Sequence, residues 1–352
     1  MTMANTVLVF LWGGITAYAV FAGADFGAGF WDLVAGDAQR GAEQRARIAT
    51  SIGPVWEANH VWLIFVLVVL WTGFPSVFAA VASTLYIPFT IAAFGVILRG
   101  TGFAFRKEVT SVRIQRIFGA CFAASSVITP FAFGAIGGGI ASGRVPPGID
   151  AGDVITSWIN PTSVLGGVIA VCVCAYVAAV LLCADCKRDG QDELVEVFRR
   201  RALVMAVVIA IVGVAGAPIL AIDSPQLFHG LIGRGLPVIT VSGLFGLASI
   251  VLLWKRRLVA VRATAAVAVI AVVWSWGVAQ YPVMLVPSYG VAQAAAPDAV
   301  LIALIIGLSI GIALVIPALL ALFHLSQSPA ATRHGGAAQP AELQDAVPDR
   351  SR

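Results

Sequence analysis

Long apolar runs separated by short charged connections make up most of this sequence. A helix needs about 20 consecutive apolar residues to cross the hydrocarbon core of a bilayer. The first run is longer than one crossing requires, which is typical of a tilted helix. The pattern therefore predicts an all-α, polytopic membrane protein with nine spans, at residues 6–34, 55–74, 77–98, 117–140, 161–183, 202–222, 237–254, 263–281 and 299–323.

Composition agrees with that pattern. The 352 residues are 59% hydrophobic and 11% charged, and their mean hydropathy is +0.94. Soluble globular domains carry about 25% charged residues. A core surrounded by water cannot hide this much apolar surface, so we expect lipid to be the solvent. The first run also lacks the basic segment of a cleavable signal peptide.

The basic residues predict an orientation. All but two of the 22 Lys and Arg residues fall in alternate connections, near the span ends there, or in the C-terminal tail; the exceptions are Arg144 and Arg234. Because basic connections stay in the cytoplasm, we expect the N-terminus outside and the C-terminus inside. The tail, residues 326–352, is rich in Ala, Gln, Pro and charge, which predicts a disordered cytoplasmic end.

Two carboxylates in the first span are candidate functional groups. In "GADFGAGFWDL", Asp25 and Asp32 are two helical turns apart and share one face. A carboxylate is costly in lipid and normally faces a bundle interior, a water cavity or a partner. Asp32 can instead lie among the headgroups. Glycines between the two acids allow a neighbouring helix to approach closely.

The start of the second span holds a second polar group. If the helix begins at Pro54, then Glu57 lies in its first turn, where the helix dipole favours the anion and burial favours the protonated acid. His60 follows one turn later, and Asn59 can hydrogen-bond across helices. We interpret these residues as a proton entry path from the cytoplasm; an interfacial capping cluster is the alternative interpretation.

Other polar positions have simpler explanations. Arg99 is either the counter-charge of Asp25 or Glu57, or a side chain that extends to the headgroups. Asp223 and His229, in an outer connection, are expected to face solvent. The spacing of Cys183 and Cys186 is a weak signal for a zinc or redox site. We favour the interpretation that both are small buried residues in a reducing compartment.

The sequence lacks the residues and motifs that several kinds of catalytic or cofactor site require. With four histidines and four methionines, the chain is poor in ligands for several haems or a copper site. It also has no nucleotide loop, nucleophile elbow or metalloprotease helix. We expect no catalytic residue, no metal site and no nucleic-acid partner on this chain.

Four segments in this order, "GADFGAGF", "PVWEANHVWLI", "LRGTGFAFR" and "WGVAQYPVML", resemble the signatures of subunit II of cytochrome bd-type quinol oxidases. The resemblance implies two four-helix bundles, at 1–142 and 143–297, and a peripheral ninth helix at 298–325. It places Asp25 in a D-F-G motif and Glu57 at the acidic position of a P-V-W-D-G-N motif, with Trp56 and Asn59 beside it. Arg99 matches the arginine of L-R-G.

The resemblance also implies a respiratory role in the bacterial cytoplasmic (inner) membrane. The partner would be subunit I, which carries haems b and d, oxidises quinol and reduces dioxygen to water with protons from the cytoplasm. Subunit II would stabilise this heterodimer and line part of a proton-uptake path through Asp25, Glu57, His60 and Asn59. A small single-helix accessory subunit, membrane lipid and a structural quinone complete the implied partners.

This sequence departs from the family pattern at several motif positions. Glu57 replaces the commoner Asp, Ala58 replaces Gly, His60 stands where Glu or Gln is frequent, and Ala104 stands where an acid is frequent. Such changes are typical of a divergent branch, for example the cyanide-insensitive type. Two other functions stay open at this point: a secondary transporter with carboxylates between its repeats, and a purely structural scaffold for a haem-bearing partner.

Overall fold

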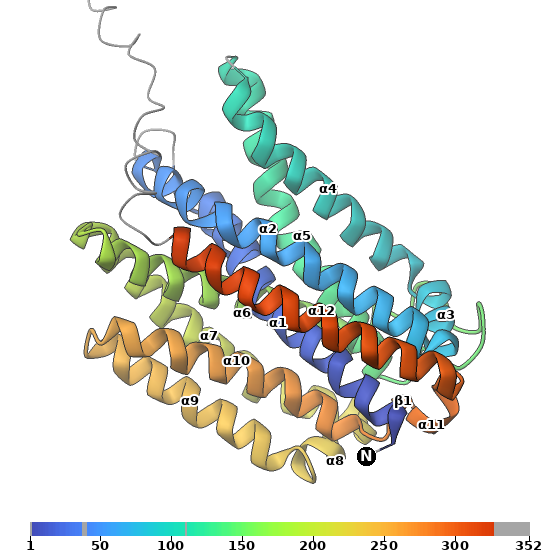
Figure 1. Ribbon diagram of the computed structural model, residues 1–352. Coiled ribbons are helices and arrows are strands. Elements are labelled where there is room, and N and C mark those ends of the chain that lie inside the picture. The colour runs from blue at the N-terminus through green and yellow to red at the C-terminus, as the bar shows by residue number, and fades with distance from the viewer. Residues whose placement is uncertain (1, 37–40, 110, 327–352) are drawn as a thin grey trace, which may run out of the picture. The chain divides into compact units, whose positions relative to one another are not determined.

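A computed structural model describes residues 2–36, 41–109 and 111–326 (Figure 1). The chain divides into a compact unit of residues 1–306 and a second unit from residue 307, whose described part continues the last helix. The tail, for which we predict disorder, lies almost entirely outside the described residues. The division of residues 1–297 into two four-helix bundles stays a prediction.

The described chain is almost entirely helical, so the all-α prediction is confirmed (Figure 1). A two-stranded antiparallel hairpin, β1 with β2, interrupts the helices once. The helices are α1 (Met3–Leu33), α2 (Ala42–Gly73), α3 (Pro75–Thr84), α4 (Tyr86–Glu108), α5 (Val112–Ala141), α6 (Pro161–Arg188), α7 (Asp192–Asp223), α8 (Pro225–Ile232), α9 (Leu236–Trp254), α10 (Leu258–Gln280), α11 (Val291–Ala294) and α12 (Asp298–Ser326), and the strands are β1 (Val283–Leu285) and β2 (Tyr289–Gly290).

Among the described residues, eight helices are long and apolar enough to cross a membrane. The number becomes nine if the bent pair Asn59–Gly73 and Pro75–Thr84, which meet at 118°, forms one span. The third predicted span, 77–98, is not one continuous helix, because the chain breaks at Leu85 between α3 and α4. Pro88 lies in the first turn of α4, where its missing N–H costs no helical hydrogen bond.

Helix α2 begins earlier than we expect from the sequence. It starts at Ala42 rather than at Pro54, so Glu57 does not lie in a first turn and the dipole argument for this residue is wrong. Cross-helix ion pairs explain the extension: Arg47 contacts Asp185 on α6, with Nη2 and Oδ2 3.7 Å apart, and also bonds Asp189. These pairs stabilise the polar first turns of α2.

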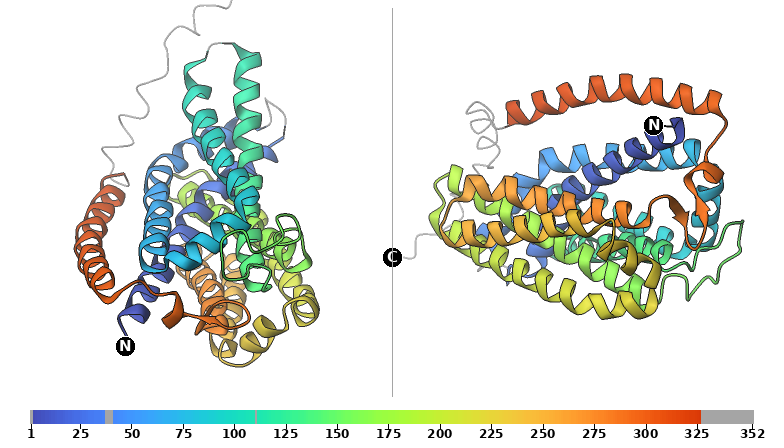
Figure 2. Two further views of the ribbon diagram at one scale, coloured as in Figure 1. Left: turned by 90° about the vertical axis from the view of Figure 1, so that its right-hand side faces the viewer. Right: turned by 90° about the horizontal axis from the view of Figure 1, so that it is seen from below.

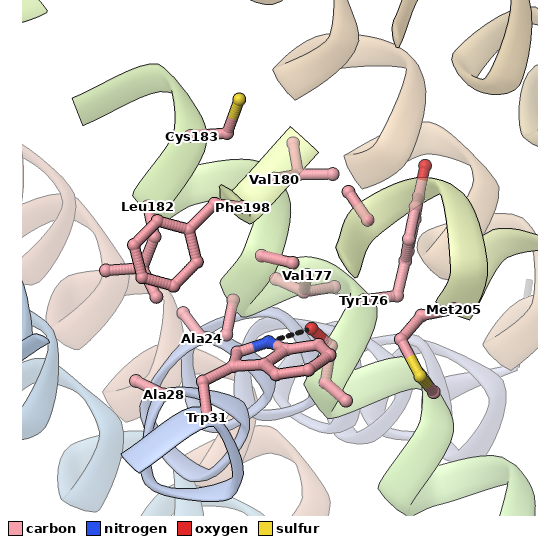
Figure 3. Close-up of a cluster of buried hydrophobic side chains, with 14 of the residues drawn as sticks. Ala24, Ala28, Trp31, Tyr176, Val177, Val180, Leu182, Cys183, Phe198 and Met205 are labelled. Carbon is pink, nitrogen blue, oxygen red and sulfur yellow. Dashed lines mark hydrogen bonds between the residues drawn. The ribbon is translucent and has the colours of Figure 1, made fainter. Parts of the chain in front are cut away.

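The centre of the first unit is the contact between α1 and α6. Trp31 donates its indole N–H to the backbone oxygen of Ala175 over 2.7 Å, inside a cluster of buried apolar side chains that includes Phe198 (Figure 3). A Cβ at Gly27 would collide with the carbonyl group of Cys174, so the two backbones touch at this point. Helices α4 and α5 run side by side, as do α9 and α10 (Figure 2). Asp25 precedes Gly27 by two residues on α1 and is buried in this packed region.

Candidate functional site

A buried ion pair joins α1 to α4. Asp25 is 0% exposed and Arg99 is 1% exposed. Arg99 donates from Nη2 to Asp25 Oδ1 over 2.5 Å and from Nε to Oδ2 over 3.1 Å. Its Nη2 also reaches the backbone oxygen of Asp25, 2.6 Å away. Of the two sequence interpretations of Arg99, the structure shows the counter-charge of Asp25.

The guanidinium group of Arg99 contacts two aromatic rings and a serine hydroxyl group in addition to Asp25. Its carbon atom lies 4.4 Å from the ring centre of Phe122 and 5.0 Å from that of Phe26. Its Nη1 donates to the hydroxyl group of Ser126 on α5, which in turn donates to the backbone oxygen of Phe122. A cation between aromatic faces gains electrostatic stabilisation, and the gain is larger where the cation is shielded from the outside solvent. Arg99 therefore has one fixed position.

Asn59 brings α2 into the same network. Its amide nitrogen donates to Asp25 Oδ2 over 3.2 Å, and the residue is 2% exposed. Close packing at Gly29 makes the arrangement possible, because a Cβ there would collide with Ser126 Oγ and Arg99 Nη1. Four helices thus meet at one carboxylate: α1, α2, α4 and α5.

Some buried polar atoms around this network have no protein partner among the described residues. They include the hydroxyl oxygen of Tyr18, the amide oxygen Oδ1 of Asn59 and the hydroxyl oxygen of Thr129. Tyr18 lies two helical turns before Asp25 on α1. Buried polar groups normally find a protein or water partner. These atoms are therefore suited to hydrogen-bond water beside the carboxylate.

A cavity of about 230 Å³ lies next to the buried pair. Asp32 and Arg45 line it, with Oδ1 and Nε 3.7 Å apart. Phe103 and Phe122 line another part of its wall. Phe122 also contacts the guanidinium group of Arg99, so this residue borders both the cavity and the buried pair.

The structure brings together only part of the predicted site. Asp25, Asn59 and Arg99 form one network, and Asp32 lies at the neighbouring cavity. His60 is a partly exposed residue of α2. The side chains of Trp56 and Glu57 lie outside the described residues, although their backbone belongs to α2.

A second Arg–Asp pair contradicts one expectation. Asp223 does not simply face solvent, since its carboxylate accepts two hydrogen bonds from Arg144, with donor–acceptor distances of 2.6 and 3.0 Å. Thr162 donates to the same carboxylate from its hydroxyl and backbone groups. We call Arg144 with Asp223 the peripheral pair and Arg99 with Asp25 the buried pair. His229, in contrast, is exposed as expected.

Metal ligands do not gather in the part of the chain that the structure describes. No group of three His, Cys, Asp or Glu side chains there could hold a metal ion. Cys183 and Cys186 are free and buried in α6, and the thiol group of Cys183 lies 3.5 Å from the backbone oxygen of Val195. Both cysteines belong to the cluster of buried apolar side chains.

Tyr18, Phe122 and Ser126 belong to the site, although none of them is among the candidate residues predicted from the sequence. Tyr18 precedes Asp25 by seven residues, as Asp25 precedes Asp32, so the three groups follow one face of α1. That spacing is a signal that can be read from the sequence. Ser126 lies in the apolar run of α5, where a serine that faces a neighbouring helix is a candidate hydrogen-bonding group.

The fold and the site define a multi-pass helical membrane protein with a charged network enclosed by four helices. Residues 3–326 match the family model described as cytochrome bd terminal oxidase subunit II, and the chain belongs to that family. The family and the apolar helices together identify a multi-pass bacterial membrane protein.

Two curated relatives have names in keeping with this family. The cytochrome bd ubiquinol oxidase subunit 2 of Bacillus subtilis is 31% identical over 153 residues, which are 43% of this chain and 44% of the relative. The cytochrome bd-I ubiquinol oxidase subunit 2 of Escherichia coli K12 is 28% identical over 177 residues, 47% of this chain and 45% of the relative. The chain thus spans less than half the length of each of these relatives.

A solved structure shows the same fold. The bd oxidase structure from Geobacillus thermodenitrificans matches with a TM-score of 0.74 and covers 92% of this chain and 98% of the other. Their sequence identity is 23%, so this likeness speaks for the fold alone.

Proposed function

We propose that this chain is the non-haem subunit II of a bd-type terminal quinol oxidase. It supports a haem-bearing subunit I, which oxidises quinol and reduces dioxygen to water. Membership of the subunit II family supports this role, together with the names of the two curated relatives. In this proposal haems b and d belong to the partner subunit, and the present chain contributes helices and buried polar groups. A small single-helix subunit and lipid complete the assembly.

We further propose that the chain lines part of a cytoplasmic proton-uptake path. The observation that carries this proposal is the hydrogen bond from Asn59 of α2 to the buried carboxylate of Asp25. Glu57 precedes Asn59 by two residues on α2, and His60 follows Glu57 by almost one helical turn. Two titratable groups of α2 thus lie within two residues of Asn59, which binds the enclosed carboxylate.

The ion pair defines what Asp25 can do in such a path. Arg99 compensates the charge of the carboxylate, so a negative group can remain at membrane depth. Asn59 holds one carboxylate oxygen while its own Oδ1 stays free to accept a hydrogen bond from water. The hydroxyl group of Tyr18 offers the next such position along α1. The path in this proposal is a chain of side chains and water molecules.

The cavity beside Asp32 is a second element of the proposed path. Asp32 and Arg45 supply charge at this cavity, and such groups keep water close to them. In this proposal Phe122 lies between the water in the cavity and the buried pair. We propose that the cavity is the cytoplasmic entrance and that movement of the Phe122 ring connects it to Asp25. This entrance requires the orientation that the basic residues predict, with the N-terminus outside.

A purified complex tests the class of function. Copurified haem and quinol-dependent oxygen uptake support the oxidase, whereas solute flux without either supports the transporter. In the assembled complex, Glu57→Gln should lower oxygen uptake and membrane potential between pH 6 and 8. Glu43→Gln is the matched control, since Glu43 is an exposed carboxylate in the first turn of the same helix.

Two outcomes contradict the proposal. Normal turnover and potential in Glu57→Gln across this pH range would leave the chain as a structural scaffold. A C-terminal reporter that is active only in the periplasm would overturn the orientation.

A further inference from the structure

A cavity of about 320 Å³ lies between α8 and the end of α10, away from the buried pair. Two basic residues line it: His229 from the last turn of α8 and Arg234 from the connection between α8 and α9. Its other lining residues include Gln226, Gly230, Gly233 and Gln280.

The walls of this cavity are firmly packed. Gln280 donates its amide to the backbone oxygen of Met284 over 2.9 Å and accepts from the indole of Trp276 over 2.8 Å. Gln226 donates to the backbone oxygen of Pro287 over 3.1 Å. A Cβ at Gly230 would collide with the backbone oxygen of Ala279, so α8 lies directly against α10. These contacts fix the positions of the residues that line the cavity.

The charge of this cavity is not balanced by the protein. No carboxylate lines it, and within the described residues no ion pair is found for Arg234. Arg144, the other basic residue outside the alternate basic connections, is paired with Asp223. An arginine favours a bidentate contact with phosphate, and a histidine beside it adds another hydrogen-bond donor.

We propose that His229 and Arg234 bind a phosphate group, and that its source is the headgroup of a phospholipid. Helix α8 fits this ligand: Leu227 is buried against the protein, while His229 on the same short helix is exposed. The same helix connects two candidate membrane spans, α7 and α9, so it lies near the headgroups. The outer leaflet follows from the proposed orientation, but the phosphate site itself does not depend on it.

Native mass spectrometry of the full detergent-solubilised complex tests this site by counting retained phospholipid molecules. The double variant His229→Gln with Arg234→Gln should lower the occupancy of one retained phospholipid about tenfold or more, because the charge-assisted contact of Arg234 and the hydrogen bond of His229 are lost. Arg234→Lys keeps the charge and should retain part of the occupancy. Lys255→Gln is the matched control, since Lys255 is an exposed cation at the other end of α9.

The two sources of phosphate are separated by competition. If inorganic phosphate at millimolar concentration binds the wild-type site and no phospholipid is lost from the double variant, the ligand is free phosphate and the lipid assignment is wrong. Equal phospholipid retention in all variants, without phosphate binding, overturns the site. Equal loss in Lys255→Gln also overturns it, since the attraction is then a general surface effect. Oxygen uptake is not the readout, so this test and that of the proposed function fail independently.

Discussion

The buried pair and the peripheral pair use the same chemistry in different surroundings. Both join an arginine to an aspartate through two hydrogen bonds. The side chains of Arg99 and Asp25 are 1% and 0% exposed, while those of Arg144 and Asp223 are 33% and 13% exposed. The solvent around the protein can therefore reach the peripheral pair but not the buried pair.

This difference separates a functional candidate from a structural one. The peripheral pair ties the loop after α5 to the end of α7, and its charges are partly screened by solvent. The buried pair must compensate its charges internally, and it does so with Asn59, Ser126 and two aromatic rings. Ionisable residues at membrane depth are rare and usually functional. This is why the proton path that we propose includes the buried pair and not the peripheral pair.

The largest expected effect is that of breaking the buried pair. Arg99→Gln leaves the carboxylate of Asp25 enclosed without its counter-charge, so the free energy of unfolding should fall by about 3–5 kcal/mol. Denaturant titration of the purified complex measures this loss. The double variant Asp25→Leu with Arg99→Met should recover much of the stability, since neither charge then remains. A loss no larger than that of a peripheral variant would contradict the account.

Close packing around the buried pair gives the next effect. Gly29→Ala should lower the free energy of unfolding by about 1–3 kcal/mol, because the new methyl group meets Ser126 and Arg99. Gly13→Ala on the same helix is the matched control, since nothing lies within 4 Å of a Cβ there. That control should be neutral or stabilising by up to about 1 kcal/mol. Similar losses in both variants would show that α1 tolerates no alanine anywhere, whatever its neighbours.

The peripheral pair should contribute much less. Arg144→Gln is expected to lower the free energy of unfolding by about 1 kcal/mol or less, since the pair is partly solvated. The effect should shrink further between low and high salt, whereas that of Arg99→Gln should not. Denaturant titrations of both variants at two salt concentrations measure the contrast. A salt-insensitive loss of several kcal/mol would make the two pairs equivalent.

Removal of the Tyr18 hydroxyl group should have the smallest effect on stability. Because this group has no hydrogen-bond partner among the residues that the structure describes, Tyr18→Phe should change the free energy of unfolding by only about 0.5 kcal/mol or less. If Tyr18 belongs to the proton path, the same variant lowers the rate of quinol-driven oxygen uptake. Unchanged oxygen uptake would remove Tyr18 from the path and leave Asp25 as its last group on α1.

The sequence predicts the buried pair better than its surroundings. The cost of a carboxylate in lipid is a local property, so it identifies Asp25 without a structure. Arg99 is harder to predict, because an arginine near a span end can extend to the headgroups or turn inward. Only the packing of α4 against α1 and α5 decides between these positions. The seven-residue spacing to Tyr18 can be read from the sequence, although the burial of its hydroxyl group cannot.

Two predictions from the sequence, the start of α2 and the solvent exposure of Asp223, are wrong for the same physical reason. The start of α2 is stabilised by contacts of Arg47 with the distant end of α6, and hydropathy does not reveal such contacts. Asp223 is held by Arg144, 79 positions away in the sequence. In both cases a polar segment that looks solvent-exposed is paired with another segment that only the fold brings near. Apolar patterns predict the helices, whereas long-range polar contacts require the structure.

Proton uptake by the assembled complex tests the central claim most directly. Proteoliposomes with a pH-sensitive dye on the cytoplasmic side would report protons taken up after a pulse of quinol and oxygen. The variant Asp25→Asn keeps the size of the side chain and removes its proton-binding carboxylate. We predict slower uptake in this variant than in wild type, with the haem content unchanged. Uptake at the wild-type rate would contradict the claim that the carboxylate enclosed by α1, α2, α4 and α5 lies on the proton path.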